Sequence, residues 1–159
     1  MSKTIVVQML LLASLAATAF PQAPVVAVPD PEALVKSKDK QLEANKKLVL
    51  DMVRDFLTAH KLDTAEKYFT PEYIQHNPNA ASGRDAVVQF FKALFPNPEK
   101  NPPKMQIVKL VAEGDMVIVA FPREYKDPKD PSKTYTTTWF DMYRIANGKI
   151  AEHWDPATK

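Results

Sequence analysis

Cysteine is absent from this chain of 159 residues. Its absence excludes thiol catalysis, zinc sites built on thiolates and a disulfide framework. A strong charge of either sign is also missing, because the formal net charge is only +2. A field of that size does not steer a polyanion, so we expect no nucleic-acid partner. Hydrophobic residues make up 45% of the chain and charged residues 25%, which is the balance of an ordinary globular protein with one buried core.

The hydrophobic run near the N-terminus is too short to span a bilayer comfortably. It extends from Ile5 to Ala19, whereas a spanning helix needs ~20 apolar residues. The run follows Lys3, the only charged side chain in the first 29 residues, and ends in small residues. This order is typical of a secretory signal peptide, here residues 1–19.

An uncleaved anchor or an N-terminal core helix would be the alternative to a signal peptide. The Pro-rich stretch from Pro21 to Pro31 argues against both, because it cannot continue a helix. We therefore expect an exported protein, periplasmic or secreted, with no membrane contact after signal cleavage. Residues 20–29 should form an extended tether, and residues 30–159 the folded domain.

The folded domain has its expected helices first and its expected strands afterwards. Asp30 and Pro31 suit the N-cap and first position of a helix, and Ser82 with Asp85 resembles a capping box. Hydrophobic periodicity predicts helices over 42–60, 63–69 and 84–95, and strands over 105–112, 116–121, 134–145 and 149–155. This order indicates an α+β fold with helices on one face of an antiparallel sheet.

Three segments resemble the SnoaL-like group of the NTF2-like superfamily: Tyr73-Ile74-Gln75-His76-Asn77-Pro78, Trp139-Phe140-Asp141-Met142-Tyr143-Arg144, and Gly148-Lys149-Ile150-Ala151-Glu152-His153-Trp154-Asp155. The resemblance covers essentially the whole domain. It implies a cone in which a curved antiparallel sheet wraps around the N-terminal helices and leaves a pocket at its open end. Relatives include polyketide cyclases, ketosteroid isomerases, dehydratases and members without enzymatic activity, so it implies the fold more strongly than the chemistry.

Four residues are the candidate catalytic groups: Asp155, Asp141, His76 and His153. His76 is either a pocket acid, base or donor, or a core histidine that fixes the next turn. Asp141 is unusual inside a strand, and burial would suit it to proton transfer; otherwise it is an exposed carboxylate or pairs with an arginine. The expected substrate-binding residues around them are Tyr73, Trp139, Tyr143 and Asn77. Tyr143 stands where relatives often have phenylalanine, which adds a hydroxyl near the site.

The register of the last hairpin decides whether these groups share one face. A two-residue turn at Asn147-Gly148 would place Asp141 opposite Trp154. A three-residue turn with a bulge at Gly148 would instead place Asp141 opposite His153. The second register collects the unusual polar residues on one face, and we favour it for that reason.

A metal site is a weaker interpretation of the same residues. His76, His153 and Asp155 have the composition of a site with two histidines and one carboxylate. That spacing is common by chance, and the resemblance implies no metal, so we expect neither a metal nor another cofactor.

The leading functional hypothesis is a cofactor-independent enzyme that acts on a small hydrophobic carbonyl compound. Asp155, or else Asp141, would remove a proton next to the carbonyl, and His76 or His153 would donate a hydrogen bond to the enolate oxygen. The alternatives are an exported protein that binds a small ligand without reaction, and a dimerisation module of the same fold. We expect a homodimer that buries the convex face of the sheet.

The signal-peptide hypothesis predicts that the mature protein begins near Phe20. N-terminal sequencing of the protein purified from the cells that express it measures this directly. A soluble product that retains Met1 or Ser2 in the cytosol would contradict export.

Overall fold

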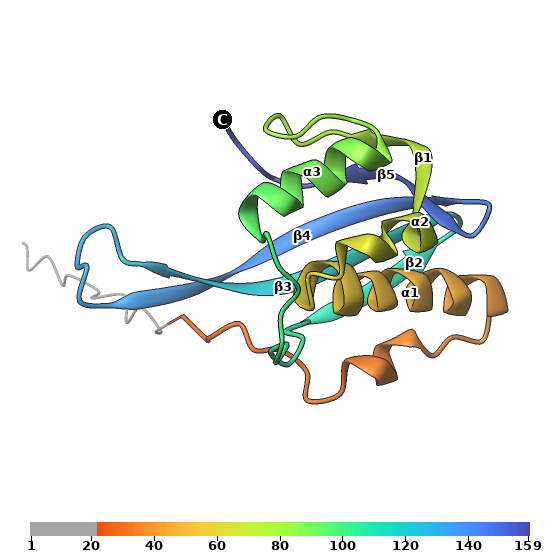
Figure 1. Ribbon diagram of the computed structural model, residues 1–159. Coiled ribbons are helices and arrows are strands. Elements are labelled where there is room, and N and C mark those ends of the chain that lie inside the picture. The colour runs from red at the N-terminus through yellow and green to blue at the C-terminus, as the bar shows by residue number, and fades with distance from the viewer. Residues whose placement is uncertain (1–21) are drawn as a thin grey trace, which may run out of the picture.

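A curved, five-stranded sheet with the order β1-β5-β4-β3-β2 organises the molecule (Figure 1). The computed structural model describes residues 22–159. Its strands are β1 (Phe69–Gln75), β2 (Lys109–Glu113), β3 (Met116–Lys126), β4 (Thr134–Ala146) and β5 (Lys149–Trp154). Neighbouring strands are antiparallel except that β1 runs parallel to β5. The predicted α+β fold is confirmed.

The helices come before most of the strands and cover one face of the sheet (Figure 1). They are η1 (Pro31–Val35), α1 (Lys40–Met52), the π-helical turn η2 (Val53–Thr58), η3 (Leu62–Thr64), α2 (Ala65–Tyr68) and α3 (Arg84–Leu94). Asp30 caps η1 and Asp39 caps α1, because each carboxylate accepts hydrogen bonds from backbone N–H groups of the first turn. Across residues 22–159, none of the helices combines the length and hydrophobicity that crossing a bilayer requires.

The expected signal peptide, residues 1–19, lies outside the described residues. Residues 22–29 of the expected tether are extended, as their prolines predict, and they are hydrogen-bonded to the domain. The amide of Val25 donates to Thr136 Oγ1 at 2.7 Å, and the amide of Val28 donates to the Ile107 carbonyl at 2.8 Å. The segment is therefore bound to β4 at Val25 and to the chain just before β2 at Val28.

The core lies between the helices and the concave face of the sheet. Phe56 of η2 is fully buried, and its ring meets Phe69 of β1 and Phe91 of α3 edge to face, at 5.1 and 5.2 Å between centroids. Phe69 in turn meets Tyr73 at 5.1 Å. Such edge-to-face pairs add to the hydrophobic stabilisation. This row of rings leads from the core to the open end of the cone.

Strand β1 is the element that the sequence did not reveal. Pro71 interrupts its pattern, and a proline inside a run normally argues against a strand. The structure accommodates Pro71 because β1 is at the edge of the sheet and pairs only with β5, with an irregularity between Phe69 and Ile74. Strand β3 also extends through Pro122 to Lys126, beyond residue 121, where the predicted strand ends.

The predicted capping box at Ser82 is wrong. Gly83, with φ of 101°, is the N-cap of α3 and makes no side-chain cap. The Ser82 hydroxyl instead accepts a hydrogen bond from the Gln75 amide at 3.0 Å, and the Gly83 amide donates to the Tyr73 carbonyl at 2.6 Å. These bonds fold the segment after β1 back onto the strand and bring α3 over the open end of the sheet.

The last hairpin has neither of the two registers that the sequence suggested. Its turn is the two-residue type, with φ of 52° at Asn147 and 71° at Gly148, so Ala146 pairs with Lys149. The favoured three-residue turn is therefore wrong. A bulge at Ala151 then shifts the pairing by one residue, and His153 lies opposite Tyr143 rather than Asp141.

Candidate functional site

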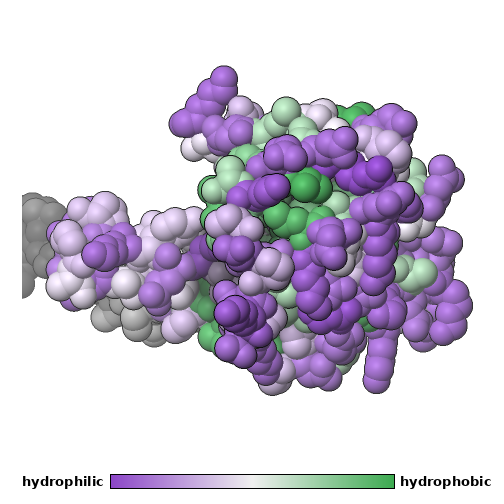
Figure 2. Space-filling view, viewed as in Figure 1, coloured by the Kyte–Doolittle hydropathy of each residue, from purple (hydrophilic) through white to green (hydrophobic). Residues whose placement is uncertain are grey.

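A cavity of about 330 Å³ opens between α3, the end of β1 and the concave face of β3, β4 and β5. Its wall is largely aromatic and apolar; the aromatic side chains are Phe69, Tyr73, Phe90, Phe91, Phe95, Trp139 and Tyr143. Figure 2 shows a patch of hydrophobic residues at the surface in the region of α3, with hydrophilic residues around it. The volume suits a small hydrophobic ligand.

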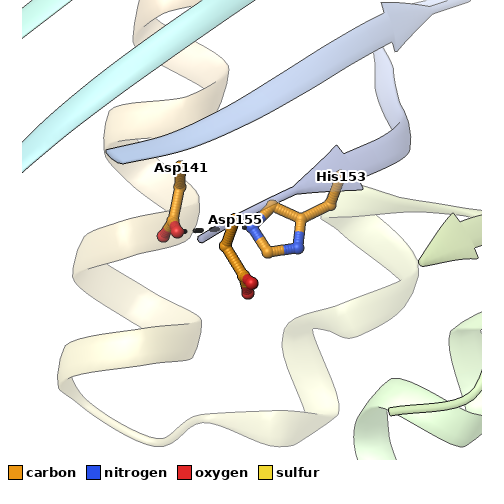
Figure 3. A group of neighbouring side chains, drawn as sticks. All are labelled: Asp141, His153 and Asp155. Carbon is orange, nitrogen blue, oxygen red and sulfur yellow. Dashed lines mark ion pairs between the residues drawn. The ribbon is translucent and has the colours of Figure 1, made fainter. Parts of the chain in front are cut away.

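Three ionisable side chains meet inside this apolar wall (Figure 3). Asp141 comes from β4 and His153 from β5, and Asp155 is the first residue after β5. Their ligand-type atoms all lie within 4.8 Å of one another. Asp141 and His153 are only 9% and 8% exposed. The alternation of side chains along β5 places His153 and Asp155 on the same face. Because of the bulge at Ala151, this is the concave face, to which Asp141 of β4 also points.

Asp141 is held by donors from its own strand. Trp139 Nε1 donates to Oδ1 at 2.8 Å, and the Tyr143 hydroxyl donates to Oδ2 at 3.2 Å. His153 Nε2 lies 3.4 Å from the same Oδ1. Residues at i−2 and i+2 share the face of a strand, so the sequence itself supplies both donors. These hydrogen bonds offset part of the cost of burying a polar group in an apolar wall.

Asp155 is fixed from outside the sheet. Asn77 Nδ2, from the segment after β1, donates to Oδ2 at 2.8 Å, and the Ala157 amide donates to Oδ1 at 2.9 Å. Asp155 is less buried than Asp141, and it lines the cavity. The two carboxylates therefore stand in different environments, one within the sheet and one at the rim.

The tyrosines of the site remain neutral hydroxyl groups. Burial raises the pKa of Tyr143 well above its ordinary value, and the charge of Asp141 raises it further. Burial likewise raises the pKa of Tyr73, and the charges of Asp141 and Asp155 add to the effect. Tyr73 accepts a hydrogen bond from Gln75 Nε2 at 3.1 Å. Both hydroxyls can thus donate hydrogen bonds over the whole physiological pH range.

The prediction that His76 reaches the cavity is wrong. Gln75 pairs with His153 on the concave face, so the next side chain lies on the convex face. There the His76 ring stacks on Trp154 at 4.7 Å, and its Nε2 lies 2.8 Å from Glu152 Oε1. Arg144 Nε donates to the other oxygen of Glu152 at 2.7 Å. The hydrogen bonds from His76 and then Arg144 lower the pKa of Glu152.

The other expected site residues, Tyr73, Asn77, Trp139 and Tyr143, all line the cavity. Two further polar residues of the wall were not among the site residues expected from the sequence, although Arg123 was considered as an ion-pair partner of Asp141. Arg123 of β3 lies with its guanidinium 5.7 Å from the Trp139 ring, and Gln75 of β1 contacts His153. Period-two alternation over Tyr73, Gln75 and Asn77 was the available signal for Gln75, but Pro71 concealed the strand.

The composition of the three-residue cluster would also allow a metal ion. One imidazole nitrogen and two carboxylates within 4.8 Å could surround a divalent cation. However, each oxygen of Asp141 and of Asp155 already accepts a hydrogen bond from the protein. These donors orient both carboxylates, and each oxygen keeps a second lone pair.

A family model described as a SnoaL-like domain matches residues 49–153, which include the cavity wall from Met52 to His153. The chain belongs to the SnoaL-like family. The predicted family is confirmed. No protein in a search of curated sequences matches this SnoaL-like chain.

Solved structures share the fold of this SnoaL-like domain. A candidate polyketide cyclase from Acidithiobacillus ferrooxidans is 18% identical, with 76% of this chain and 89% of that chain covered and a TM-score of 0.54. TsrD from Streptomyces laurentii is also 18% identical, with 75% and 90% covered and a TM-score of 0.53. A candidate polyketide cyclase from Bacillus cereus is 18% identical, with 84% of both chains covered and a TM-score of 0.51. Identities this low show the common fold alone.

The raised pKa values of the cavity tyrosines are directly testable. The unfolded chain releases tyrosine protons near about pH 10, whereas the folded SnoaL-like domain holds those of Tyr73 and Tyr143 to higher pH. Stability contributed by this difference is complete below about pH 10 and is lost as the pH rises further. Phenolate absorbance of the native protein up to about pH 11 should be the same for wild type, Tyr73→Phe and Tyr143→Phe.

The same titration in denaturant provides the control. There each variant should lose the signal of one tyrosine. A smaller native signal in either variant would show that the hydroxyl ionises in the folded state.

Proposed function

We propose that this SnoaL-like domain is a cofactor-independent enzyme that removes a proton next to the carbonyl group of a small hydrophobic compound. The observation that carries the proposal is the convergence of Asp141, His153 and Asp155 on one apolar cavity. Carboxylates and an imidazole in such surroundings are the usual groups of general acid–base catalysis. Aldol cyclisation, isomerisation and dehydration all begin with this step. The candidate polyketide cyclases among the structural neighbours are compatible with the first of these.

Asp155 is the proposed base. It stands at the rim of the cavity, and the Asn77 amide and the Ala157 N–H orient its carboxylate. The C–H bond next to the carbonyl breaks, its proton moves to an Asp155 oxygen, and the electron pair moves onto the carbonyl oxygen to give an enolate. Asp141 is the reserve candidate, because two donors and His153 already surround it.

His153 is the proposed donor to the enolate oxygen. Its Nε2 is directed into the cluster and lies 3.4 Å from Asp141 Oδ1. His76, the other candidate from the sequence, is on the convex face and leaves this role. A preorganised donor in a site with little water stabilises the developing charge without rearrangement.

A ligand-binding protein without catalysis is the second candidate. It is favoured by one specific observation: both oxygens of each carboxylate already have hydrogen-bond donors within the protein. A cluster satisfied in this way could serve only to fix the shape of an aromatic pocket. A measurement of proton removal separates the two candidates.

Exchange of carbon-bound hydrogen in deuterium oxide measures proton removal without knowledge of the natural substrate. We expect the protein to accelerate exchange next to the carbonyl of β-tetralone or phenylacetone above the buffer rate. Asp155→Asn should reduce this acceleration by at least about 100-fold, because the amide cannot accept the proton.

Asp115→Asn is the matched control, since Asp115 is exposed in the β2–β3 turn, and it should exchange at the wild-type rate. Exchange that persists in Asp155→Asn but disappears in Asp141→Asn would move the role of base to Asp141. If the ketones bind, as detected by quenching of Trp139 fluorescence, but no variant or wild type accelerates exchange, the protein is a binder.

We also propose that the protein is exported and forms a homodimer through the convex face of its sheet. The register places Val111, Ile118, Met142 and Trp154 in one row across β2, β3, β4 and β5. Val111 is 51% exposed, and Phe140, beside the row, is 53% exposed. Apolar side chains on a sheet face lose hydration when a second copy covers them.

Light scattering at micromolar concentration should give the mass of a dimer. Phe140→Lys should give a monomer, because it buries an unpaired charge in the interface. Tyr135→Lys is the matched control, since Tyr135 is an exposed aromatic residue of the same strand that packs against Tyr125 on the hairpin arm. A monomeric wild type would contradict the proposal.

A further inference from the structure

One ring nitrogen of His153 stands out within the cavity cluster. Its Nδ1 lies 2.9 Å from Gln75 Oε1, a normal hydrogen-bond distance. Its Nε2 is buried and makes no hydrogen bond within residues 22–159. The closest charged atom is Asp141 Oδ1 at 3.4 Å. The position of the ring proton therefore decides whether Nε2 of His153 and the carboxylate of Asp141 attract or repel each other.

The orientation of the Gln75 amide follows from its other contacts. Its oxygen accepts a hydrogen bond from the Asn77 backbone amide at 3.0 Å, and its nitrogen donates to the Tyr73 hydroxyl at 3.1 Å. A backbone N–H can only donate, so the atom that faces it must be the carbonyl oxygen. The same oxygen faces His153 Nδ1, and it can only accept. The proton of the imidazole must then be on Nδ1.

The opposite tautomer would place two lone pairs against each other. With its proton on Nε2, His153 would donate to Asp141, but the bare Nδ1 would face the Gln75 oxygen at 2.9 Å. Rotating the amide to relieve this would direct its NH₂ group at the Asn77 N–H instead. Gln75 thus has no orientation that suits an unprotonated Nδ1.

We infer that Gln75 is a positioning residue that holds a proton on His153 Nδ1 in every charge state of the ring, so that Nε2, next to Asp141, is the nitrogen that takes up and releases a proton in the cavity. The chemical use of this proton rests on the proposed function, in which Nε2–H donates to the enolate oxygen. The location of the proton itself does not depend on any reaction.

Other titratable groups surround the same ring. Tyr143 of β4 stacks on it with 4.8 Å between ring centroids, and Asp141 faces Nε2 from the same strand. Asp155, Tyr73 of β1 and Arg123 of β3 line the same cavity. The hydrogen-bond partner of Nδ1 is Gln75, whereas Asp141 faces Nε2. Gln75 therefore selects the nitrogen that carries the proton in the neutral ring.

Nitrogen-15 NMR of the full mature protein, labelled at histidine, tests the inference without substrate. His153→Gln identifies the signals of His153 among those of the three histidines. As the pH is raised, Nε2 should move to the chemical shift of an unprotonated ring nitrogen, while Nδ1 should keep the shift of an N–H. Loss of the proton from Nδ1 in the wild-type protein would overturn the inference.

Two substitutions of Gln75 strengthen the test. Gln75→Met removes the acceptor at similar length, so the neutral ring should switch to the Nε2–H tautomer. Gln75→Glu keeps an acceptor, so Nδ1 should retain its proton, and the added charge should shift the titration of Nε2 to higher pH. A Gln75→Met protein that folds and keeps the wild-type tautomer would contradict the role of Gln75.

Gln89→Met is the matched control, because Gln89 is an exposed glutamine of α3. It should leave both nitrogen signals of His153 unchanged. His76, whose ring lies on the opposite face, is an internal reference in every spectrum and should keep its own tautomer in Gln75→Met.

Ketone exchange provides the second readout. Gln75→Met should slow exchange by about 10- to 100-fold, the range typical of residues that orient a functional imidazole, and Gln75→Glu should recover part of it. If wild type accelerates no exchange but the proton is on Nδ1, the proposed function fails and the inference stands. If exchange occurs and the proton is on Nε2, the inference fails and the proposed function stands.

Discussion

The pairing register between β4 and β5 determines what the cavity contains. The two-residue turn at Asn147-Gly148, continued without interruption, would place His153 opposite Met142 and so on the face away from Asp141. The extra residue at Ala151 moves His153 to the face of Asp141. His153 then pairs with Tyr143, and Asp141 lies on the same face as both. Because the side chains of a strand alternate with a period of two, one bulge moves the entire end of β5 to the other face. The cavity cluster depends on that single residue more than on any contact within it.

The same alternation gives the sheet two polar centres with different properties. On the concave face, His153 and Asp155 lie in an apolar wall, where charge is costly unless it is paired or hydrogen-bonded. On the convex face, Glu152 joins Arg144 and His76 in an ion-pair network that solvent can reach. Partly exposed pairs of this kind contribute little stability, on the order of 1 kcal/mol or less. The convex centre is therefore best understood as part of the sheet surface, and only the concave centre has the burial that makes acid–base chemistry effective.

Local patterns in the sequence predicted most of the helices and four of the five strands, because each depends on caps, periodicity or turns within a short stretch. The family was indicated separately, by the resemblance of three segments to SnoaL-like proteins. Local patterns could not predict β1, since Pro71 hides a strand that is stable only as an edge partner of β5. Local patterns also could not predict on which face of the sheet His76 lies. That face is set by the parallel pairing of its neighbour Gln75 with His153, a residue distant in the sequence. Asp141, His153 and Asp155 could be expected to share a face, but for the wrong reason. The favoured register had a bulge at Gly148 in the turn, whereas the bulge is three residues further along, at Ala151.

The pattern of hydrogen bonds around the cluster differs from that of an ordinary buried polar group. A structural carboxylate or imidazole in a core is normally satisfied at every atom, because an unmade bond there costs about 1–3 kcal/mol. Here the donors are distributed unevenly. Asp141 and Asp155 are fully supplied, Gln75 occupies Nδ1 of His153, and Nε2 of the same ring is left beside a carboxylate inside a cavity. Packing alone would favour either a partner for that atom or an apolar side chain in place of the histidine. Within residues 22–159, Nε2 has no hydrogen-bond partner, and the ring lines a cavity with an aromatic wall. The proposed proton transfer to a ligand would use this arrangement.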